Sequence, residues 1–272
     1  MSIAVAITGA AGRMGREVVR AVLEAKGLRL AAAVDRHEVG ADAGTLAGCG
    51  VVGVAIEGEL DAALARTRPD ILVDFTLPDE VLANLRIAIA RGVSPVVGTT
   101  GLSAEHLAEI DRTAKEKGIG AFVAPNFAIG AVLMMQFAAQ AAKYLPDVEI
   151  IELHHEKKVD SPSGTALLTA QKIGEARRSA SVSPCPPADG LVEKAPGARG
   201  ARADVTADVP IHSVRLPGFV AHQEVIFGGA GQILTIRHDS IDRRSFMPGV
   251  ILAIRKVRGL TGVVIGLEHL LD

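Results

Sequence analysis

The chain contains no tryptophan, a single tyrosine and only two cysteines among its 272 residues. With so few aromatic side chains, it offers few platforms on which nucleic-acid bases could stack. Its 29 lysines and arginines are balanced by 31 aspartates and glutamates, and the net charge of -2 gives no basic footprint for nucleic acid or an anionic membrane. We therefore expect neither a nucleic-acid partner nor a membrane partner.

Long hydrophobic runs and paired cysteines are also missing. No apolar run approaches the roughly 18 residues of a membrane-spanning helix, and the N-terminus lacks the basic start of a signal peptide. Cys49 and Cys185 have neither CxxC nor zinc-type spacing, so we expect reduced thiols, no metal site and a cytoplasmic protein. The hydrophobic share of 49% and the charged share of 22% are typical of a globular protein with one large or two modest domains.

The N-terminal segment carries the pattern of a dinucleotide-binding unit. The apolar run Ile3–Thr8 predicts a strand, and it leads into a glycine turn at 9–15, Gly-Ala-Ala-Gly-Arg-Met-Gly. A helix pattern ending at Gly27 follows, and a second strand, Leu28–Val34, ends on Asp35. Strand, glycine turn, helix, strand and acid together form the dinucleotide fingerprint. The spacing is GxxGxxG rather than the strict GxGxxG, and a tight turn without a ligand is the alternative.

Two adjacent residues bear on the choice of cofactor. A carboxylate such as that of Asp35 accepts hydrogen bonds from an adenosine ribose, whereas an arginine such as Arg36 pairs with a 2′-phosphate. Both residues are present, so the sequence leaves NADH and NADPH open.

Strands and helices keep alternating up to residue 123, which predicts a doubly wound parallel sheet of Rossmann type. We expect a loop at 40–50, strands at 51–56, 71–75, 95–97 and 119–123, and helices at 60–66, 80–91 and 104–117. In this fold ligands lie off the carboxyl ends of the strands. Three segments fall there, each of which could instead be ordinary turn chemistry: Asp74–Thr76, Gly98–Thr100 and Ala124–Phe127.

The second half of the chain has a different pattern. We expect helices at 129–143 and from 166 to about 180, a strand at 148–153, a Pro/Gly/Arg-rich loop at 183–202, strands at 209–214, 219–227 and 232–238, and a final helix at 244–258. Strands without intervening helices indicate an antiparallel or mixed sheet. The sequence therefore predicts a second, α+β domain built on a mixed sheet.

The candidate catalytic and anion-binding residues are concentrated in the stretch Glu152–Ala166. Its sequence is Glu-Leu-His-His-Glu-Lys-Lys-Val-Asp-Ser-Pro-Ser-Gly-Thr-Ala. Ser163 is a good N-cap for a helix whose first turn, Gly164 and Thr165, would offer backbone N–H groups to an anion. Histidines that can carry a proton and two lysines lie beside this cradle, which suits a small acidic substrate that must be held and protonated. A solvated loop is the alternative, but this loop hangs from a buried-looking strand and its Pro-Ser-Gly-Thr turn fixes the geometry.

The same stretch resembles the signature of the 4-hydroxy-tetrahydrodipicolinate reductase (dihydrodipicolinate reductase) family, E-x-H-H-x-x-K-x-D-x-P-S-G-T-A, which acts in the diaminopimelate route to lysine. Shorter motifs of the family recur along essentially the whole chain: Gly12-Arg13-Met14-Gly15, Asp74-Phe75-Thr76, Gly98-Thr99-Thr100 and Asn126-Phe127. One departure stands out. Where many members carry Gly-Glu-His in a late strand, this chain has Ala221-His222-Gln223-Glu224, to which we assign no role.

The resemblance implies an NAD(P)H-dependent oxidoreductase that reduces 4-hydroxy-tetrahydrodipicolinate, a small cyclic dicarboxylate, to tetrahydrodipicolinate. It implies that His154 is the catalytic acid/base and Lys158 a proton donor. It also implies that His155, Gly164 and Thr165 bind the substrate carboxylates. The implied contacts to NADH or NADPH come from Gly9, Ala10, Ala11, Gly12, Arg13, Met14, Asp35, Arg36, Gly98, Thr99, Thr100, Ala124, Pro125, Asn126 and Phe127.

The resemblance further implies a homotetramer of two-domain chains. Residues 1–127 and 240–272 would form the dinucleotide-binding domain, because the C-terminal helix of the family rejoins it, and residues 128–239 would bind substrate and associate into the tetramer. A related dehydrogenase of another small acid, such as an amino-acid or sugar dehydrogenase, is one alternative, but it does not require the His-His-x-x-Lys loop. A non-catalytic nucleotide-sensing protein is another, and it would need neither His154 nor Lys158.

Overall fold

The structure is a computed structural model that describes residues 2–184 and 205–271. It divides into two compact units, the first made of residues 1–129 and 243–272 and the second of residues 130–242. The Pro/Gly/Arg-rich loop expected at 183–202 lies, apart from its first two residues, outside the described residues.

The first unit is built on a seven-stranded sheet in the order β12-β6-β5-β4-β1-β2-β3, with every neighbouring pair parallel. The strands are β1 (Ile3–Thr8), β2 (Leu28–Val34), β3 (Ile56–Glu57), β4 (Ile71–Asp74), β5 (Ser94–Val97), β6 (Gly120–Val123) and β12 (Gly262–Ile265). The strand order reverses between β1 and β4, which is the switch point where Rossmann folds hold dinucleotides. The predicted Rossmann-type parallel sheet is confirmed.

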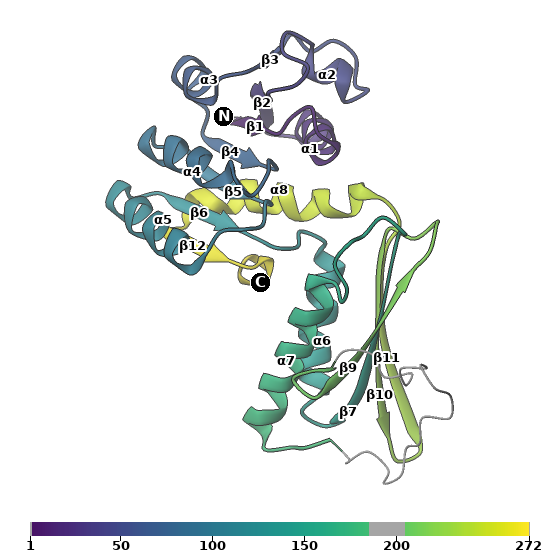
Figure 1. The fold of residues 1–272 in the computed structure, drawn as a ribbon. Coiled ribbons are helices and arrows are strands. Elements are labelled where there is room, and N and C mark those ends of the chain that lie inside the picture. Colours follow the sequence, from purple (N-terminus) through teal and green to yellow (C-terminus); the bar gives the residue numbers. More distant parts are fainter. Residues whose placement is uncertain (1, 185–204, 272) are drawn as a thin grey trace. The chain divides into compact units, whose positions relative to one another are not determined.

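Helices cover both faces of this sheet (Figure 1). One face carries α3 (Leu60–Thr67), α4 (Val81–Ala90) and α5 (Ala104–Lys117), and the other carries α1 (Arg13–Glu24) and α8 (Met247–Lys256). Because both faces are covered, the central strands read as continuous apolar runs rather than as an alternation. All four residues of β4 are buried, and in β1 only the first is not.

The segment 40–56 differs from our expectation because one carboxylate, that of Asp42, organises it. A short helix, α2 (Ala43–Leu46), replaces part of the predicted loop, and the predicted strand is reduced to the two residues of β3. Asp42 caps α2 and also accepts a hydrogen bond of 2.8 Å from the N–H of Gly53. These side-chain bonds satisfy backbone groups that a longer strand would have placed in the sheet ladder.

The C-terminal segment joins the first unit, where Figure 1 shows α8 alongside the sheet. The helix predicted at 244–258 is flanked by 3₁₀ turns, so that the order is η1 (Arg243–Phe246), α8, η2 (Val257–Gly259), β12 and η3 (Leu267–Leu270). The strand β12 was not predicted, and it extends the sheet by pairing with β6. Gly249 lets α8 pack closely, because a Cβ there would collide with the carbonyl oxygen of Phe127.

The second unit contains a five-stranded sheet in the order β11-β10-β7-β9-β8. Its strands are β7 (Asp147–His154), β8 (Val205–Thr206), β9 (Val209–Arg215), β10 (Ala221–Gly229) and β11 (Gln232–Ser240). Only β7 and β9 pair in parallel among the described strands of this sheet, and the other neighbours are antiparallel. The predicted mixed sheet is therefore confirmed, although the two-residue β8 was not predicted.

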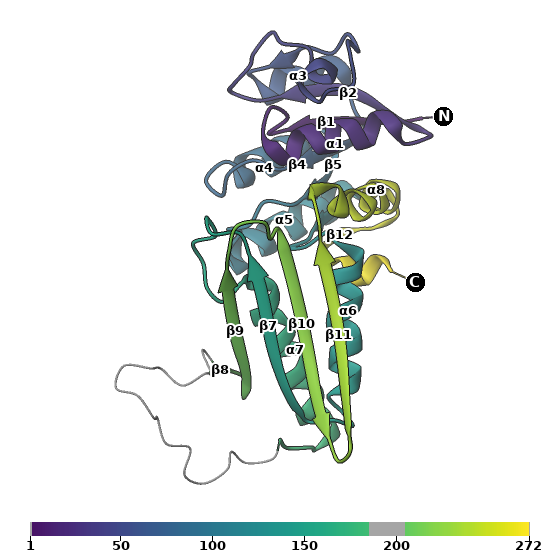
Figure 2. The ribbon, with the colours of Figure 1, turned by 90° about the vertical axis from the view of Figure 1, so that its right-hand side faces the viewer.

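Two long helices, α6 (Ile129–Ala141) and α7 (Gly164–Ala180), pack against one face of this sheet. Figure 2 shows both of them behind β7, β9, β10 and β11. Alternate residues of the strands point into this layer, and its fully buried apolar side chains include Ile150, Ile173, Ile211, Val225 and Phe227. No described helix covers the opposite face of the sheet.

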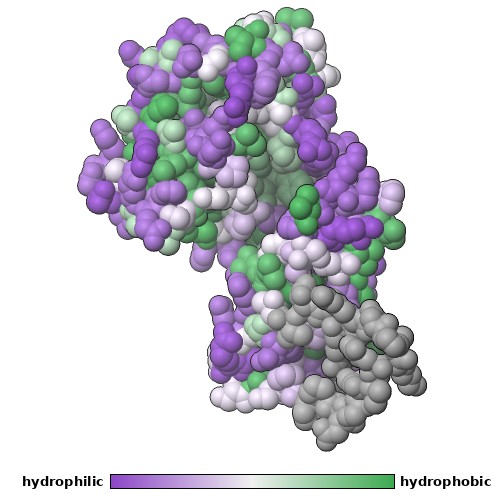
Figure 3. Space-filling view, in the orientation of Figure 1, coloured by the Kyte–Doolittle hydropathy of each residue, from purple (hydrophilic) through white to green (hydrophobic). Residues whose placement is uncertain are grey.

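The surface of the first unit mixes polar and apolar residues. Figure 3 shows hydrophilic and hydrophobic side chains interspersed over its visible face. Some of its charged side chains form ion pairs, such as Arg86 with Glu109 and Arg91 with Asp61. Among the described residues, no helix combines the length and the apolar character needed to span a membrane.

The close packing of α8 gives a prediction for Gly249→Ala. A glycine inside a helix is normally about 0.5–1 kcal/mol less favourable than alanine, so the substitution would stabilise the helix if its surroundings were open. Here the new Cβ would meet the Phe127 carbonyl, and we expect a loss of about 1–3 kcal/mol in the free energy of unfolding, measured by urea denaturation. Gly259→Ala, at a position with open space, is the control. A Gly249→Ala protein as stable as the parent would show that α8 does not pack so closely.

Candidate active site

The glycine turn between β1 and α1 is packed so closely that a side chain at Gly9 or Gly15 would have no room. Gly9 has a φ of 75°, and a Cβ on it would lie 2.6 Å from the carbonyl oxygen of Phe75. A Cβ on Gly15 would collide with the carbonyl of Gly9. Gly12 is the N-cap of α1 and provides no side-chain cap, so the first N–H groups of the helix can bind an anion such as a pyrophosphate.

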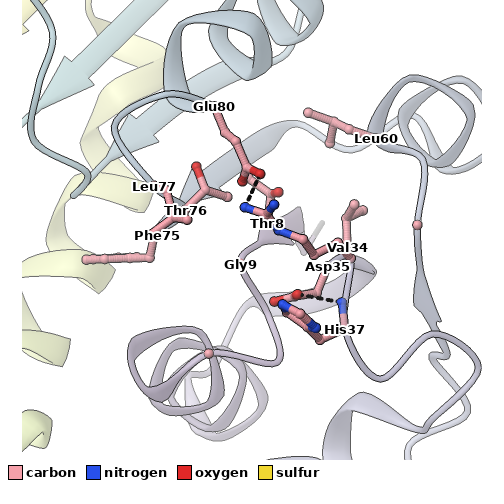
Figure 4. A pocket seen from close by; sticks show the side chains of 13 residues that line it. Thr8, Gly9, Val34, Asp35, His37, Leu60, Phe75, Thr76, Leu77 and Glu80 are labelled. Carbon is pink, nitrogen blue, oxygen red and sulfur yellow. Dashed lines mark hydrogen bonds and ion pairs between the residues drawn. The ribbon is translucent and has the colours of Figure 1, made fainter.

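A cavity of about 610 Å³ lies beside this turn, at the carboxyl ends of β1, β2 and β4 (Figure 4). Its walls combine apolar side chains, such as those of Val34 and Leu60, with polar residues at the strand ends. The volume, the glycine turn and an acid at the end of β2 fit the adenosine half of a nicotinamide dinucleotide. Predicted cofactor residues Gly9, Gly12, Asp35 and Arg36 all line it.

Asp35 is held rigidly at the end of β2. Its carboxylate accepts hydrogen bonds from the N–H of Ala11 at 3.0 Å and from the N–H of His37 at 2.9 Å. The first of these ties the acid to the glycine turn. Arg36 forms an ion pair with Glu80, which lies just before α4 and lines the cavity shown in Figure 4. No sequence pattern pointed to Glu80, because it lies 44 residues further along the chain and belongs to no motif.

Asp74, at the end of β4, is fully buried and links two of the family motifs. Its Oδ1 accepts hydrogen bonds from the hydroxyls of Thr76 and Thr99, each at 2.8 Å, and Oδ2 accepts one of 2.9 Å from the Asn84 side chain. The Thr99 side chain is therefore buried in a link between the loops after β4 and β5. It is not available to a cofactor, and any contact from Gly98–Thr100 would have to come from the backbone or from Thr100.

The segment Ala124–Phe127 follows β6, next to the loop after β5 in the strand order. Phe127 is buried and packs against two other rings. Its ring centroid lies 5.8 Å from that of Phe75 and 5.9 Å from that of Phe122. The Asn126 side chain accepts a hydrogen bond of 2.8 Å from the N–H of Ala128. Neither Gly98–Thr100 nor Ala124–Phe127 lines the 610 Å³ cavity, so the predicted cofactor residues of the first unit form two groups.

In the second unit, the predicted helix start is present at the end of the β7–α7 loop. Ser163 is the N-cap of α7, and its hydroxyl accepts a hydrogen bond of 3.3 Å from the N–H of Ala166. A Cβ added to Gly164 would meet no atom within 4 Å, so the space at the helix terminus is open. A capped and open helix N-terminus attracts anions through its N–H groups and its dipole.

Glu152 lies two residues before His154 on the same face of β7, and it is fully buried. Its Oε2 lies 2.5 Å from Nδ1 of His154, and its two oxygens accept hydrogen bonds of 2.7 and 2.9 Å from the guanidinium of Arg215. Oε1 also accepts a bond of 3.3 Å from the N–H of Ser163. One carboxylate thus contacts the proposed acid, a cation and the cap of α7.

Burial alone would raise the pKa of Glu152, but the hydrogen bonds from His154 and Arg215 outweigh burial and lower that pKa to about 2. Glu152 is consequently ionised at neutral pH. An ionised carboxylate only accepts hydrogen bonds, so Nδ1 of His154 carries a hydrogen. The other ring nitrogen, Nε2, is not engaged by Glu152.

Lys158 is paired with Asp160 within the same loop. Its Nζ lies 2.7 and 2.9 Å from the two carboxylate oxygens of Asp160, and this contact lowers the pKa of Asp160. The lysine side chain is only 22% exposed. Residues 155–158, which follow β7 directly, form a turn in which the N–H of Lys158 donates to the carbonyl of His155 at 3.1 Å.

A polar row runs across the inner face of the second sheet. The register places Ser213, Glu152, Gln223 and His238 side by side on β9, β7, β10 and β11. Gln223 donates to the hydroxyl of Thr169 at 2.8 Å, and that hydroxyl donates to the carbonyl of Thr165 at 2.7 Å. The segment that departs from Gly-Glu-His therefore supports the first turn of α7.

Comparison with known proteins places the chain in one family over almost its whole length. Residues 3–127 match the family described as "Dihydrodipicolinate reductase, N-terminus", and residues 130–271 match "Dihydrodipicolinate reductase, C-terminus". The chain belongs to the dihydrodipicolinate reductase family.

Relatives and solved structures agree with this assignment. The chain is 53% identical over 271 residues to the 4-hydroxy-tetrahydrodipicolinate reductase of Moorella thermoacetica, covering 100% of this chain and 98% of the relative. It is 52% identical to that of Geobacillus kaustophilus over 100% of both chains. The dipicolinate-bound dihydrodipicolinate reductase from Paenisporosarcina sp. TG-14 is 42% identical, with a TM-score of 0.84 over 100% of both chains. An amine dehydrogenase from Mycobacterium smegmatis shares the fold alone, at 18% identity and a TM-score of 0.66 over 97% of this chain and 95% of that one.

These findings confirm the resemblance drawn from the sequence. The chain is an NAD(P)H-dependent oxidoreductase of lysine and diaminopimelate biosynthesis, which reduces 4-hydroxy-tetrahydrodipicolinate. The alternative of a dehydrogenase for another small acid is not favoured, because the dehydrogenases among the similar structures are distant in sequence.

The environment of Glu152 gives a prediction for stability against pH. Folding lowers its pKa from the ordinary 4.5 to about 2, so its contribution is complete above the ordinary pKa and lost as the pH falls toward 2. Linkage sets this contribution at about 3 kcal/mol. Glu152→Gln cannot titrate, so the difference in free energy of unfolding between the two proteins should shrink as the pH falls below 4.5.

Urea denaturation at several pH values between 7 and 3 measures this difference. Glu109→Gln removes a carboxylate from an exposed pair with Arg86 and should leave the pH dependence nearly unchanged, because exposed pairs contribute little. A constant difference between Glu152→Gln and the parent would show that Glu152 is not held as an ionised acceptor.

Proposed function

We propose that the β7–α7 loop of the second unit binds the dicarboxylate substrate and protonates it, while the glycine turn and the cavity of the first unit hold NADH or NADPH. The observation that carries this proposal is the pairing of His154 with the buried, ionised Glu152 beside the open N-terminus of α7. A proton donor of defined orientation next to an anion cradle is what the reduction of an anionic ring requires.

The substrate carboxylates bind to His155 and to the backbone N–H groups of Gly164 and Thr165. The open space at Gly164 and the Ser163 cap support this assignment, because a helix N-terminus favours anions through its dipole. The hydrogen bonds from Gln223 through Thr169 to Thr165 hold the first turn of the helix in place.

His154 supplies the proton. When bound, NADH or NADPH would supply a hydride to the conjugated ring that forms when the 4-hydroxy substrate loses its hydroxyl group as water, and a proton must then reach the neighbouring carbon. His154 donates it from Nε2, and the imidazole that remains keeps its hydrogen on Nδ1, toward Glu152. Histidine suits this task because an imidazole can both donate and accept a proton through its ring nitrogens.

Lys158 places its ammonium near the negative charge that develops on the ring, or donates a proton itself. Its ion pair with Asp160 supports this role by limiting where the long side chain can go. Charge stabilisation of this kind acts mainly in the transition state.

In the first unit, residues 9–14 hold the pyrophosphate of the cofactor and Asp35 holds the adenosine ribose, with Arg36 available for a 2′-phosphate. Residues 98–100 and 124–127 provide further contacts from the ends of β5 and β6. Support for this assignment comes from the close-packed glycines, the cavity lined by Asp35 and Arg36, and the position of these loops after neighbouring strands.

We further propose that the chains form a homotetramer through the face of the second sheet that the described helices leave uncovered. On that face, Ile151 and Ile226 are partly exposed and Ile233 is 77% exposed. A face of this kind is typical of a buried contact between subunits. We also propose a cytoplasmic location, where NADH and NADPH are maintained for biosynthesis.

Cofactor choice is tested with Arg36→Ala. We expect NADPH to bind about 1.5–3 kcal/mol more weakly, because a charge-assisted contact is lost, with a much smaller change for NADH. Glu80→Gln is the complementary variant. It frees Arg36 from its ion pair and removes a negative charge near the 2′-phosphate, so NADPH should gain affinity relative to NADH. Dissociation constants for both cofactors give the answer, and equal losses for both with Arg36→Ala would contradict the role of the arginine.

The division of labour in the loop is tested by His154→Gln and Lys158→Ala. General acid catalysis is typically worth about 10²–10⁴-fold, so His154→Gln should lower kcat by that range with little change in cofactor affinity. Lys158→Ala should cost at least as much. Lys157→Ala is a matched control, because Lys157 has the same charge, lies next to Lys158 and is exposed. If steady-state kinetics show near-normal kcat for both main variants, the loop only binds substrate.

A further inference from the structure

Arg215 ends β9, and its guanidinium is largely buried, with 19% of the side chain exposed. The parallel pairing of β7 and β9 places it directly beside His154, and Ser213 beside Glu152. One end of the guanidinium donates to Oε2 of Glu152, and the other donates to Oε1. This two-point contact fixes the plane of the carboxylate as well as its position.

The same guanidinium also reaches the loop that carries Lys158. Its Nη2 donates to Oε1 of Glu152 at 2.7 Å and to the backbone carbonyl of Asp160 at 2.8 Å. Asp160 in turn holds the ammonium of Lys158 through its side chain. The Asp160 side chain is 61% exposed, so the position of this pair depends on the backbone that Arg215 fixes.

We infer that Arg215 is a positioning residue for both proposed catalytic groups, holding His154 through Glu152 and Lys158 through the backbone of Asp160. The inference rests on the roles proposed above for these two groups. Among the described residues, no hydrogen bond joins Arg215 directly to His154 or to Lys158.

The effect on His154 follows from what an unpaired carboxylate would do. Without a cation, a buried Glu152 would be costly in its charged form. Once protonated, it would donate to Nδ1 of His154 instead of accepting from it, and the ring hydrogen would move to Nε2 of the neutral imidazole. Arg215 thereby keeps Glu152 an acceptor and keeps the ring in one tautomer and one orientation.

A second buried arginine provides a matched control. Arg177 donates to the carbonyls of Pro146 and Asp208, just before the starts of β7 and β9, whereas Arg215 lies at the ends of those strands. Both side chains stabilise the second unit, but Arg177 touches none of the proposed catalytic residues. A purely structural role for Arg215 would make the two arginines behave alike.

The kinetic test compares Arg215→Gln, Arg215→Lys and Arg177→Gln in the full-length enzyme. Arg215→Gln should lower kcat by at least about 10-fold, but by no more than the loss seen in the His154→Gln/Lys158→Ala double variant. Arg215→Lys keeps a cation for Glu152 but cannot reach both acceptors, so its kcat should be intermediate. Arg177→Gln should lower thermal stability and leave kcat unchanged. The dissociation constant for NADH should stay the same in all three variants.

A double-mutant cycle shows through which groups the arginine acts. In the His154→Gln/Lys158→Ala background, adding Arg215→Gln should have little further effect on kcat. A further loss as large as in the parent would overturn the inference, as would a normal kcat for Arg215→Gln in the parent. Near-normal kcat values for His154→Gln and Lys158→Ala themselves would instead overturn the proposed division of labour, whatever Arg215→Gln does.

A spectroscopic measurement is independent of activity, and the result for the parent protein does not depend on whether the arginine variants fold. In the parent protein labelled with ¹⁵N-histidine, the His154 signal, assigned by its absence in His154→Gln, should report hydrogen on Nδ1 of the neutral ring. A neutral ring with its hydrogen on Nε2 would overturn the inference. In Arg215→Gln the same signal should shift toward the Nε2–H form, whereas in Arg177→Gln it should not move.

Discussion

A fully buried carboxylate, that of Glu152, is the constraint on which the site of the second unit depends. A buried charge is tolerated only when cations and hydrogen-bond donors satisfy it, and here the donors come from β7, β9 and the cap of α7. Each donor is committed to one place because the carboxylate cannot move. The proposed acid, the proposed substrate cradle and the loop that carries Lys158 are therefore parts of one hydrogen-bonded arrangement rather than three separate features.

The first unit uses the same device at the ends of its own strands. Asp74 is buried at the end of β4 and gathers hydroxyl and amide donors from Thr76, Asn84 and Thr99. It fixes the loops after β4 and β5, where a Rossmann sheet holds its ligand. Asp35, by contrast, lies at the edge of a cavity and binds backbone N–H groups. Buried acids shape the loops in both units, whereas the less buried Asp35 is the acid that we propose for cofactor recognition.

Charge also bears on the choice between NADH and NADPH. Arg36 offers a cation for a 2′-phosphate, but Glu80 already pairs with it across the cavity. A 2′-phosphate would have to share that cation and approach a carboxylate, whereas a 2′-hydroxyl would not. If Arg36 meets the 2′-phosphate as proposed, the balance between these two side chains sets the preference between the two cofactors, and small changes of sequence here would shift it.

Features that depend on neighbouring residues were predictable from the chain alone: the glycine turn, the alternation of the parallel sheet and the Ser163 cap. Helix periodicity, capping and strand alternation are local, so a single segment reveals them. Arg215, Glu80, β12 and the hydrogen bonds of Gln223 were not predictable in this way. They reach the site only through sheet register and packing between residues tens of positions apart. Local patterns can also mislead: the strand predicted at 51–56 is largely absent, because the Asp42 side chain bonds to backbone groups of that segment. Which buried charges face one another emerged only in the folded chain, because that is set by the pairing of strands and not by any one of them.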